Sequence, residues 1–123
     1  MDEEELARLM GVTRLAIGAV TVLAPSLVAK VWMGKGAEDA VSNVALRGLG
    51  GREAAIGFGT LVALERNKPV SGWLEAGALA DAADAFGVFT QRRRLAGPHW
   101  VFAAGVAAAS AWFNVQLASA LDE

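Results

Sequence analysis

The sequence predicts an all-α protein, a four-helix transmembrane bundle with a short interfacial helix after the first helix. Three observations support this prediction. Four apolar segments, each close to the ~20 residues that cross a ~30 Å hydrocarbon layer, alternate with polar breaks. No segment shows the strict two-residue alternation of a strand. The composition is 54% hydrophobic and 20% charged, whereas soluble domains contain about 45–50% apolar and roughly 25% charged residues.

The helices are expected at about 5–24, 41–65, 69–91 and 98–121, in a single domain over residues 1–123. Proline and glycine mark the breaks between them. Pro25-Ser26 ends the first helix, and Gly34-Lys35-Gly36 opens a loop. Asn67-Lys68-Pro69 forms a turn, with Pro69 at the first position of the next helix. Gly97-Pro98 has the same role before the fourth helix.

The segment 26–33 is too short to span a membrane. Its aliphatic residues, together with Lys30 and Trp32, suit a short helix in the membrane interface, and an ordinary amphipathic connector is the alternative. The N-terminus reads Met1-Asp2-Glu3-Glu4-Glu5, which is acidic where a secretory signal is basic, and no cleavage site follows. We therefore expect the first apolar segment to be a retained helix.

The composition excludes several classes of function. The chain has no cysteine, which removes disulfides, thiolate nucleophiles and iron–sulfur ligation. His99 is the single histidine, so one chain holds no multi-histidine metal site. The net charge of −2 gives no electrostatic footprint for nucleic acid. We expect no cofactor, no metal site and no nucleic-acid partner, and the sequence offers no arrangement of catalytic residues.

Charged residues interrupt the middle two apolar segments. The fourth segment has no formal charge from Trp100 to Leu121, and the first has Arg14 alone between Leu9 and Ala24. A central charge costs about 2.5–3.5 kcal/mol on insertion, so the middle segments are expected to insert together, with their charges paired. Their charged residues are Arg47, Arg52, Glu53, Glu75, Asp81 and Asp84.

Counting from a turn at Asn67 brings Arg52 level with Asp81 on an antiparallel neighbour, with Asp84 one turn beyond, towards Arg47. We therefore predict that Arg52 pairs with Asp81 or Asp84. On the third helix Asp81 and Asp84 share one face with two further residues, Gly77 and Val88. On the second, a face of small residues flanks Arg52, which lets backbones approach; its members are Gly48, Gly51, Ala55 and Gly59.

A second pair is expected between Arg14 and Glu53. Arg14 lies on a face of small residues formed by Ala7, Gly11, Gly18 and Thr21. Glu75, close to a helix end, comes level with Asn114 on the fourth helix. Among the seven charges considered for the interior, three arginines face four acids, which leaves one acid, or one proton, unmatched; they are Arg14, Arg47 and Arg52 against Glu53, Glu75, Asp81 and Asp84.

The stretch Arg47-Gly48-Leu49-Gly50-Gly51-Arg52-Glu53, followed by Ile56-Gly57, resembles a group of small, mostly actinobacterial membrane proteins akin to DoxX-like four-helix proteins. Their first helix ends in a proline, as at Ala24-Pro25-Ser26, and acidic residues sit on the third, as at Asp81 and Asp84. This chain departs in the five-residue spacing from Arg47 to Arg52. The resemblance implies a membrane bundle and brings no activity, so no functional residue is carried over.

Asp81-Ala-Ala-Asp84 has the spacing of acidic pairs that bind magnesium and diphosphate in prenyl-transferring membrane enzymes. Such enzymes need further acidic and basic groups, so pairing with Arg52 is the favoured interpretation. Intramembrane ionisable residues are candidates for function. The candidates for a ligand or proton site are Arg14, Arg47, Arg52, Glu53, Glu75, Asp81, Asp84 and Asn114.

The favoured hypothesis is a small multi-pass protein of the cell (inner) membrane that binds or transports a small molecule or proton through its charged core. One alternative is a structural or accessory membrane subunit with a purely structural ion-pair core. Another is a soluble Ala-rich four-helix bundle, and an enzyme is least favoured. The expected partners are the lipid bilayer, a second copy or another membrane protein, and a small hydrophobic or anionic ligand.

Overall fold

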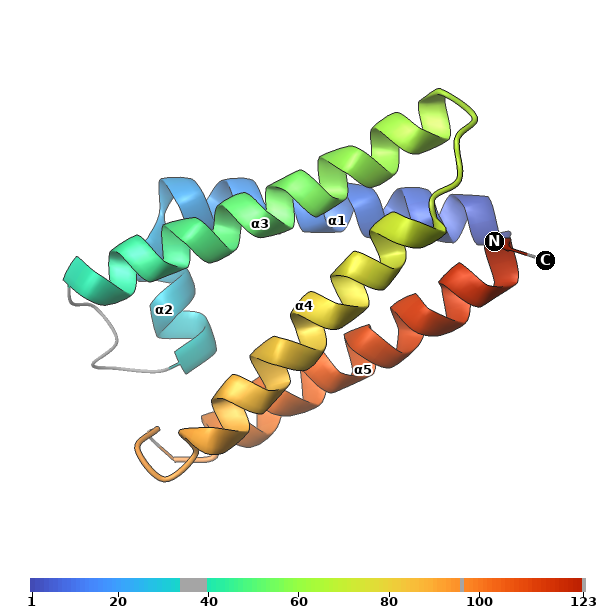
Figure 1. Cartoon of the computed structure of the whole chain (residues 1–123). Coiled ribbons are helices and arrows are strands. Elements are labelled where there is room, and N and C mark those ends of the chain that lie inside the picture. The colour runs from blue at the N-terminus through green and yellow to red at the C-terminus, as the bar shows by residue number, and fades with distance from the viewer. Residues whose placement is uncertain (34–39, 96, 123) are drawn as a thin grey trace.

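The computed structural model describes residues 1–33, 40–95 and 97–122, and this part of the chain is helical and contains no strand. The helices are α1 (Glu3–Leu23), α2 (Pro25–Met33), α3 (Ala40–Glu65), α4 (Ser71–Thr90) and α5 (His99–Leu121) (Figure 1). The predicted all-α class is confirmed. The long helices α1, α3, α4 and α5 begin and end within about two residues of the predicted positions.

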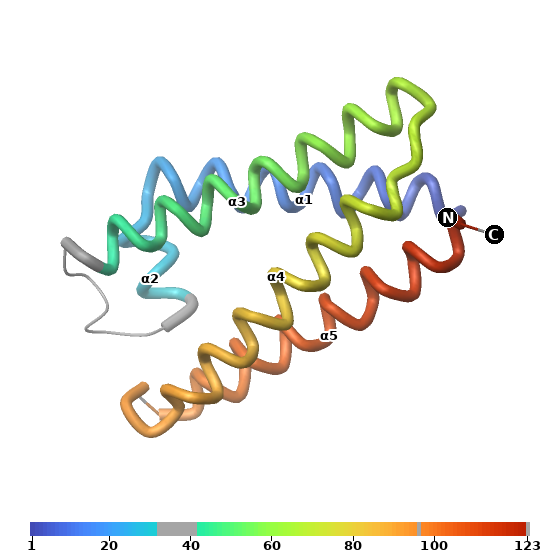
Figure 2. The backbone as a smooth tube through the Cα atoms, viewed as in Figure 1, coloured from blue at the N-terminus to red at the C-terminus, as the bar shows by residue number. Residues whose placement is uncertain are grey.

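The long helices form two antiparallel pairs that cross each other at an angle. α1 lies along α3, and α4 lies along α5, while α3 and α4 touch over a much shorter stretch (Figures 1 and 2). The short helix α2 turns back beneath the end of α1 (Figure 2). The start of α1 and the end of α5 lie at the end of the molecule where α3 leads into α4.

Local sequence accounts for the helix boundaries. Asp2 and Glu5 form a reciprocal capping box at the start of α1. Pro25 is the first residue of α2, where its missing N–H costs nothing. α2 confirms the predicted short helix, although Lys35 and the side chain of Trp32 lie outside the described residues.

Two predicted helix starts are wrong by one or two residues. α4 begins at Ser71 with Val70 as its N-cap, so Pro69 precedes the helix instead of opening it. Asn67 adopts a φ of 50°, and this left-handed turn needs the extra residues before α4 can start. Pro98 is the N-cap of α5 and not its first residue.

Direct backbone contact through glycine joins α1 to α3. A Cβ atom at Gly18 would lie 2.4 Å from the backbone nitrogen of Ala54, and one at Gly57 would lie 2.5 Å from the carbonyl oxygen of Gly11. Only glycine allows this approach. The predicted face of α1 is confirmed, because all of its members are buried: Ala7, Gly11, Arg14, Gly18 and Thr21.

The predicted small-residue face of α3 is confirmed only at Gly59, which is buried and where a Cβ atom would lie 2.5 Å from the Trp73 ring of α4. Its other small residues do not pack against a helix. Gly48, Gly51 and Ala55 are exposed, and a Cβ atom at either glycine would meet nothing within 4 Å. α3 instead turns Gly50, Gly57 and their neighbours towards α1, because its main partner is α1 and not α4. The predicted face of α4 is correct: Gly77, Asp81 and Val88 are buried and Asp84 is half-buried.

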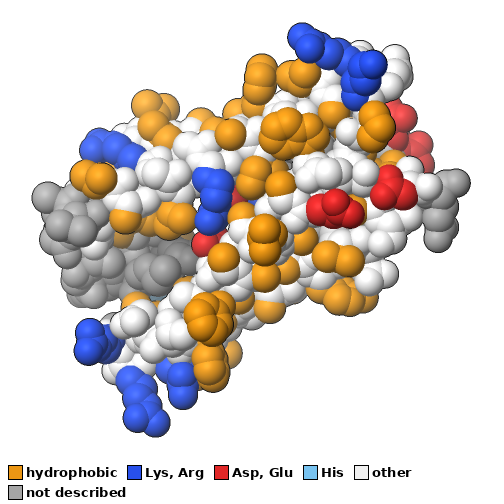
Figure 3. Space-filling model, viewed as in Figure 1, with side chains coloured by type: hydrophobic (Ala, Val, Ile, Leu, Met, Phe, Trp, Pro, Cys, Tyr) orange, Lys and Arg blue, Asp and Glu red, His pale blue; other side chains and the backbone are white. Residues whose placement is uncertain are grey.

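The apolar core is small and lies where α1 begins, α5 ends and α3 leads into α4. Its buried members are Ala7, Ala63, Leu64, Val70, Leu74, Leu117 and Ala118. Many larger apolar side chains point outwards, among them Leu79 (74% exposed) and Phe86 (70% exposed). Figure 3 shows apolar side chains spread over the visible face, with groups of basic side chains at its upper right and lower left ends.

Two of the described helices, α1 and α5, are long and apolar enough to cross a membrane, as judged by length and composition. α3 and α4 do not meet this criterion, although both have spanning length.

Candidate functional site

A continuous network of ion pairs and hydrogen bonds runs through the middle of the molecule and joins all four long helices. α1 supplies Arg14, α3 supplies Arg52 and Glu53, and α4 supplies Asp81 and Asp84. Hydrogen bonds extend the network onto α5 through Ser110 and Asn114. We call this set of seven residues the charged interior.

Arg14 is the centre of the charged interior. Its Nη1 donates to Glu53 Oε2 at 2.5 Å, and its Nη2 donates to Asp81 Oδ2. The Arg14 side chain is 6% exposed, and those of Asp81 and Glu53 are 10% and 15% exposed. Gly77 makes room for the arginine, since a Cβ atom there would lie 2.9 Å from Arg14 Nη2. The predicted Arg14–Glu53 pair is confirmed, and Arg14 also has a partner that was not predicted.

Arg52 forms the more open end of the network. Its Nη2 donates to Asp84 Oδ2 at 2.7 Å, and its Nη1 donates to Asp84 Oδ1 at 3.2 Å. A longer contact of 3.4 Å reaches Glu53. The side chains of Arg52 and Asp84 are 31% and 34% exposed, so this pair is more accessible from outside the bundle than the Arg14–Asp81 pair.

The predicted pairing of Arg52 with Asp81 or Asp84 is therefore confirmed for Asp84. Asp81 pairs with Arg14 instead. The residue count from Asn67 assumed that α3 and α4 run alongside each other, whereas the two helices diverge after the turn (Figure 2). The divergence lets α1 reach Asp81 and moves Arg52 on to the next acidic residue of the same face, about one turn further.

The most enclosed end of the network lies between α4 and α5. Ser110 Oγ donates to Asp81 Oδ2 at 2.6 Å, and Asn114 Nδ2 donates to the carbonyl oxygen of Ser110 at 2.8 Å. Asn114 is fully buried. Its Oδ1, together with Arg14 Nε and Arg52 Nε, is buried without a hydrogen-bond partner among the described residues. The interior therefore keeps hydrogen-bonding capacity for a further polar group.

The charged interior carries an excess of one negative charge, because Arg14 and Arg52 face Glu53, Asp81 and Asp84. Each carboxylate contacts an arginine, but the arginines are shared. Asp81 and Asp84 contact different arginines, so this acidic pair serves the arginine network, as the favoured interpretation of its spacing predicts.

Two predicted site residues lie outside the network. Arg47 is exposed and its Nε donates to the carbonyl oxygen of Val22, at the end of α1, so Asp84 does not turn towards it. Glu75 is exposed on the outer face of α4, whereas Asn114 points inwards from α5, so these two residues do not meet. The prediction used only the position of each residue along its helix axis, and that position does not determine which way the side chain faces.

Ser110 is the member of the network that the sequence did not indicate. It lies four residues before Asn114, on the same face of α5. The signal that could have identified Ser110 is this four-residue spacing of two polar side chains in an otherwise alanine-rich helix.

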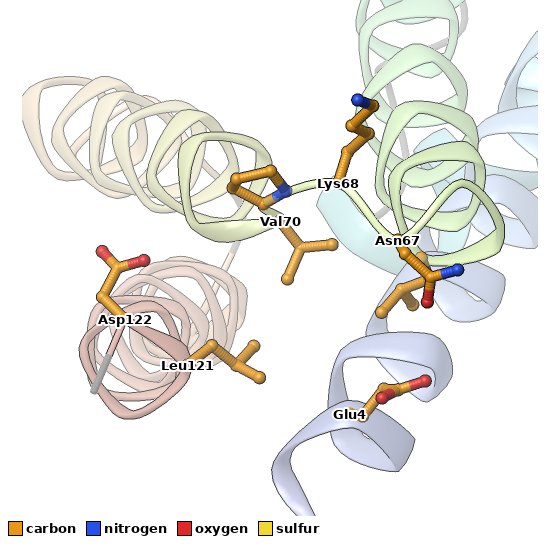
Figure 4. Close-up of a pocket in the computed structure, with 8 residues that line it drawn as sticks. Glu4, Asn67, Lys68, Val70, Leu121 and Asp122 are labelled. Carbon is orange, nitrogen blue, oxygen red and sulfur yellow. The ribbon is translucent and has the colours of Figure 1, made fainter.

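Two cavities lie away from the charged interior. One of about 330 Å³ opens where the ends of α1 and α5 meet the α3–α4 turn, and Figure 4 shows Glu4, Asn67 and Asp122 around it. The other, of about 400 Å³, is a shallow and largely apolar groove along the outer side of α4 and α5. Neither cavity is lined by a member of the charged interior.

Comparison of the chain with family models, with curated proteins and with solved structures found no match.

Proposed function

We propose that this protein is a multi-pass integral membrane protein of the cell (inner) membrane whose charged interior binds an exchangeable proton. The observation that supports this most is the inverted distribution of side chains. Ionised groups occupy the centre, and large apolar groups cover the outside. A water-soluble bundle has the opposite arrangement.

The exposed apolar surface extends over all four long helices. Val12 on α1, Phe58 on α3, Leu79 on α4 and Phe102 on α5 are each at least half exposed, at 50%, 60%, 74% and 57%. In α1 and α5, 28% of the apolar window is buried, whereas the core helix of a soluble protein is mostly buried. Such an apolar surface favours contact with lipid over contact with water.

The charged interior accounts for the less apolar helices α3 and α4. Their charges at Arg52, Glu53, Asp81 and Asp84 are neutralised within the bundle, largely against each other and against Arg14 from α1. The insertion cost of a central charge, about 2.5–3.5 kcal/mol, falls when the charge is paired away from lipid. We propose that α3 and α4 span the membrane together with α1 and α5.

Basic and aromatic side chains where α4 ends and α5 begins suit a membrane interface. In the α4–α5 loop, the guanidinium of Arg92 lies 4.1 Å from the centre of the Phe89 ring, and Phe89 contacts Trp100 edge-on at 6.2 Å. Basic and aromatic side chains together are typical of a membrane interface. We place α2, with Lys30, in the interface on this same side.

The excess negative charge supports the proton-binding role. A carboxylate without its own counter-charge is costly in a low-dielectric interior, and a bound proton removes that cost. Glu53, Asp81 and Asp84 are linked through Arg14 and Arg52, from a half-exposed end to an enclosed one. A proton entering beside Asp84 has a connected set of acceptors that leads towards Asn114.

The membrane location is tested by expressing the protein without detergent and washing the membranes with alkaline carbonate. The expected result is that the protein stays in the membrane pellet. Monomeric protein that remains in the supernatant after ultracentrifugation overturns the proposal and favours the soluble bundle.

The proton is tested by infrared spectroscopy of the protein in lipid at neutral pH. We expect the carbonyl stretching band of one protonated carboxyl group, with the small downshift in heavy water that identifies it. Asp81→Asn, Asp84→Asn or Glu53→Gln should each abolish the band. Each variant leaves two arginines and two carboxylates, so the charged interior has no net charge and binds no extra proton. Arg14→Gln should add a second band.

The matched control is Glu65→Gln, which removes an exposed carboxylate that pairs with Arg8 outside the charged interior. This variant should keep the band. A wild-type protein without a protonated carboxyl at neutral pH contradicts the proton-binding role.

One observation favours a second candidate, a structural or accessory membrane subunit. The inner half of the network is closed: Arg14, Asp81 and Asn114 are at most 7% exposed, and neither described cavity reaches them. On this candidate the ion pairs only specify how the helices dock. The infrared experiment separates the two, because a purely structural network shows no exchangeable proton.

A further inference from the structure

We infer that the apolar groove between α4 and α5 is a binding site for lipophilic monovalent cations, with Glu75 as the counter-charge and Trp112 as the aromatic wall. The inference rests on the proposed membrane location and is separate from the proton in the charged interior. The groove is formed by Glu75, Ala78, Leu79 and Ala82 of α4 and by Ala111, Trp112 and Val115 of α5.

Glu75 is the feature that points to a cation. It is exposed on the outer face of α4, about one helical turn inside the start of the helix at Ser71. Among the described residues, Glu75 forms no ion pair. This position lies near the proposed membrane interface, where a carboxylate without a counter-charge attracts a cation from outside the chain.

Trp112 gives the groove its second recognition element. Its side chain is 67% exposed, and it lines the groove together with Glu75. The face of an indole ring attracts cations, most strongly where water is excluded. Trp112 lies roughly two and a half turns from the end of α5 at Leu121, deeper than Glu75, where an apolar ligand body is favoured.

The remaining wall selects the class of ligand. Alanines at 78, 82 and 111 leave the floor shallow and smooth, and Leu79 and Val115 add apolar edges. The volume of about 400 Å³ lies within the range of small-molecule sites, about 300–1,000 Å³. An aromatic or aliphatic cation with a dispersed charge can make apolar contacts with the groove and pair with the carboxylate of Glu75. A strongly hydrated ion can pair with the carboxylate but makes no apolar contacts.

The test uses tetraphenylphosphonium, a monovalent aromatic cation, and measures its binding to the full chain in detergent by titration calorimetry and by tryptophan fluorescence. Tetraphenylborate, which has nearly the same shape and the opposite charge, is the matched control ligand. We expect saturable binding of the phosphonium and no saturable binding of the borate.

Two variants assign the site. Glu75→Gln should weaken phosphonium binding about tenfold or more. Trp112→Leu should weaken it roughly five- to thirtyfold and remove most of the fluorescence change. The matched control is Glu65→Gln, an exposed carboxylate on the other helix pair, which should leave the affinity unchanged. Circular dichroism and gel filtration check that each variant stays folded.

Several outcomes overturn the inference. Equal binding of the borate means simple partition into apolar surface. Unchanged affinity in Glu75→Gln, or loss of affinity in Glu65→Gln, means that the groove is not the site. A change of oligomeric state in Trp112→Leu without phosphonium binding to the wild type means that the groove is a contact between copies. These results are independent of the infrared band, so the two proposals fail separately.

Discussion

Loss of Arg14 is expected to destabilise the protein more than loss of any other member of the charged interior. Arg14 contacts both Asp81 and Glu53, and all three side chains are at most 15% exposed. Removing one partner of a buried pair typically costs about 3–5 kcal/mol, since it leaves an uncompensated charge. Arg14→Met leaves Glu53 with only its 3.4 Å contact to Arg52, so we expect the upper part of that range.

Arg52 provides the matched comparison. Its pair with Asp84 is about one-third exposed, so solvent or headgroups can screen the carboxylate that is left behind. Arg52→Met should therefore cost less, about 1–3 kcal/mol, between the values for exposed and buried pairs. The free energy of unfolding is measured by titrating each variant from mild micelles with dodecyl sulfate and following helicity by circular dichroism.

Double-mutant cycles identify the partners. Combining Arg14→Met with Asp81→Asn should restore a large part of the loss, with a coupling near 3 kcal/mol, the upper end for directly bonded groups. Combining Arg52→Met with Asp81→Asn should give a coupling near 0.5 kcal/mol, because these residues share only the network. Couplings in the reverse order, or additive effects of Arg14→Met and Asp81→Asn, would contradict this assignment of partners.

Two glycine contacts and the charges near the helix ends give three more expectations. Gly18→Ala should cost at least about 1–3 kcal/mol of unfolding free energy, because its Cβ atom would meet the Ala54 backbone, whereas Gly48→Ala, in open space, should be neutral or stabilise by about 0.5–1 kcal/mol; equal effects contradict the α1–α3 contact. Gly77→Ala should cost about 1–2 kcal/mol through a clash with Arg14, and the loss should disappear in an Arg14→Met background; persistence of the loss there would show another cause. Both termini should lie outside the cell, and the connections after α1 and after α4 inside, because Lys30, Lys35 and Arg92-Arg93-Arg94 outnumber Arg8, Arg66 and Lys68 on the opposite side; a C-terminal reporter that is active only in the cytoplasm overturns this orientation.

The sequence predicts the helices and the packing faces of α1 and α4 well. Each long helix is bounded by proline, glycine or a polar turn, and those residues act locally. The inner face of α1 was predictable because its small residues and Arg14 form a single stripe between large apolar residues. The pair of Arg14 with Glu53 followed from that stripe.

The partner of each remaining charge depends on how the helices cross. α3 has glycine on several sides, at Gly48, Gly50, Gly51, Gly57 and Gly59, so its composition does not say which side meets α1. Packing against α1 selects Gly50 and Gly57, and the divergence of α3 from α4 then assigns Asp84 to Arg52. These choices are made by non-local contacts, which a residue count along two helices does not contain.

In the proposed architecture the apolar outer surface faces lipid, while the ion pairs of the charged interior lie between the helices. The chain has no cysteine, so single cysteines introduced in place of Leu79, Val12 and Arg93 carry nitroxide spin labels without background labelling. In lipid vesicles, collisions with oxygen and with a water-soluble nickel complex are measured by electron paramagnetic resonance. We expect labels at 79 and 12, on opposite helix pairs, to be reached by oxygen and shielded from nickel, and the label at 93 to be reached by nickel. Nickel accessibility at 79 and 12 equal to that at 93 would contradict the account.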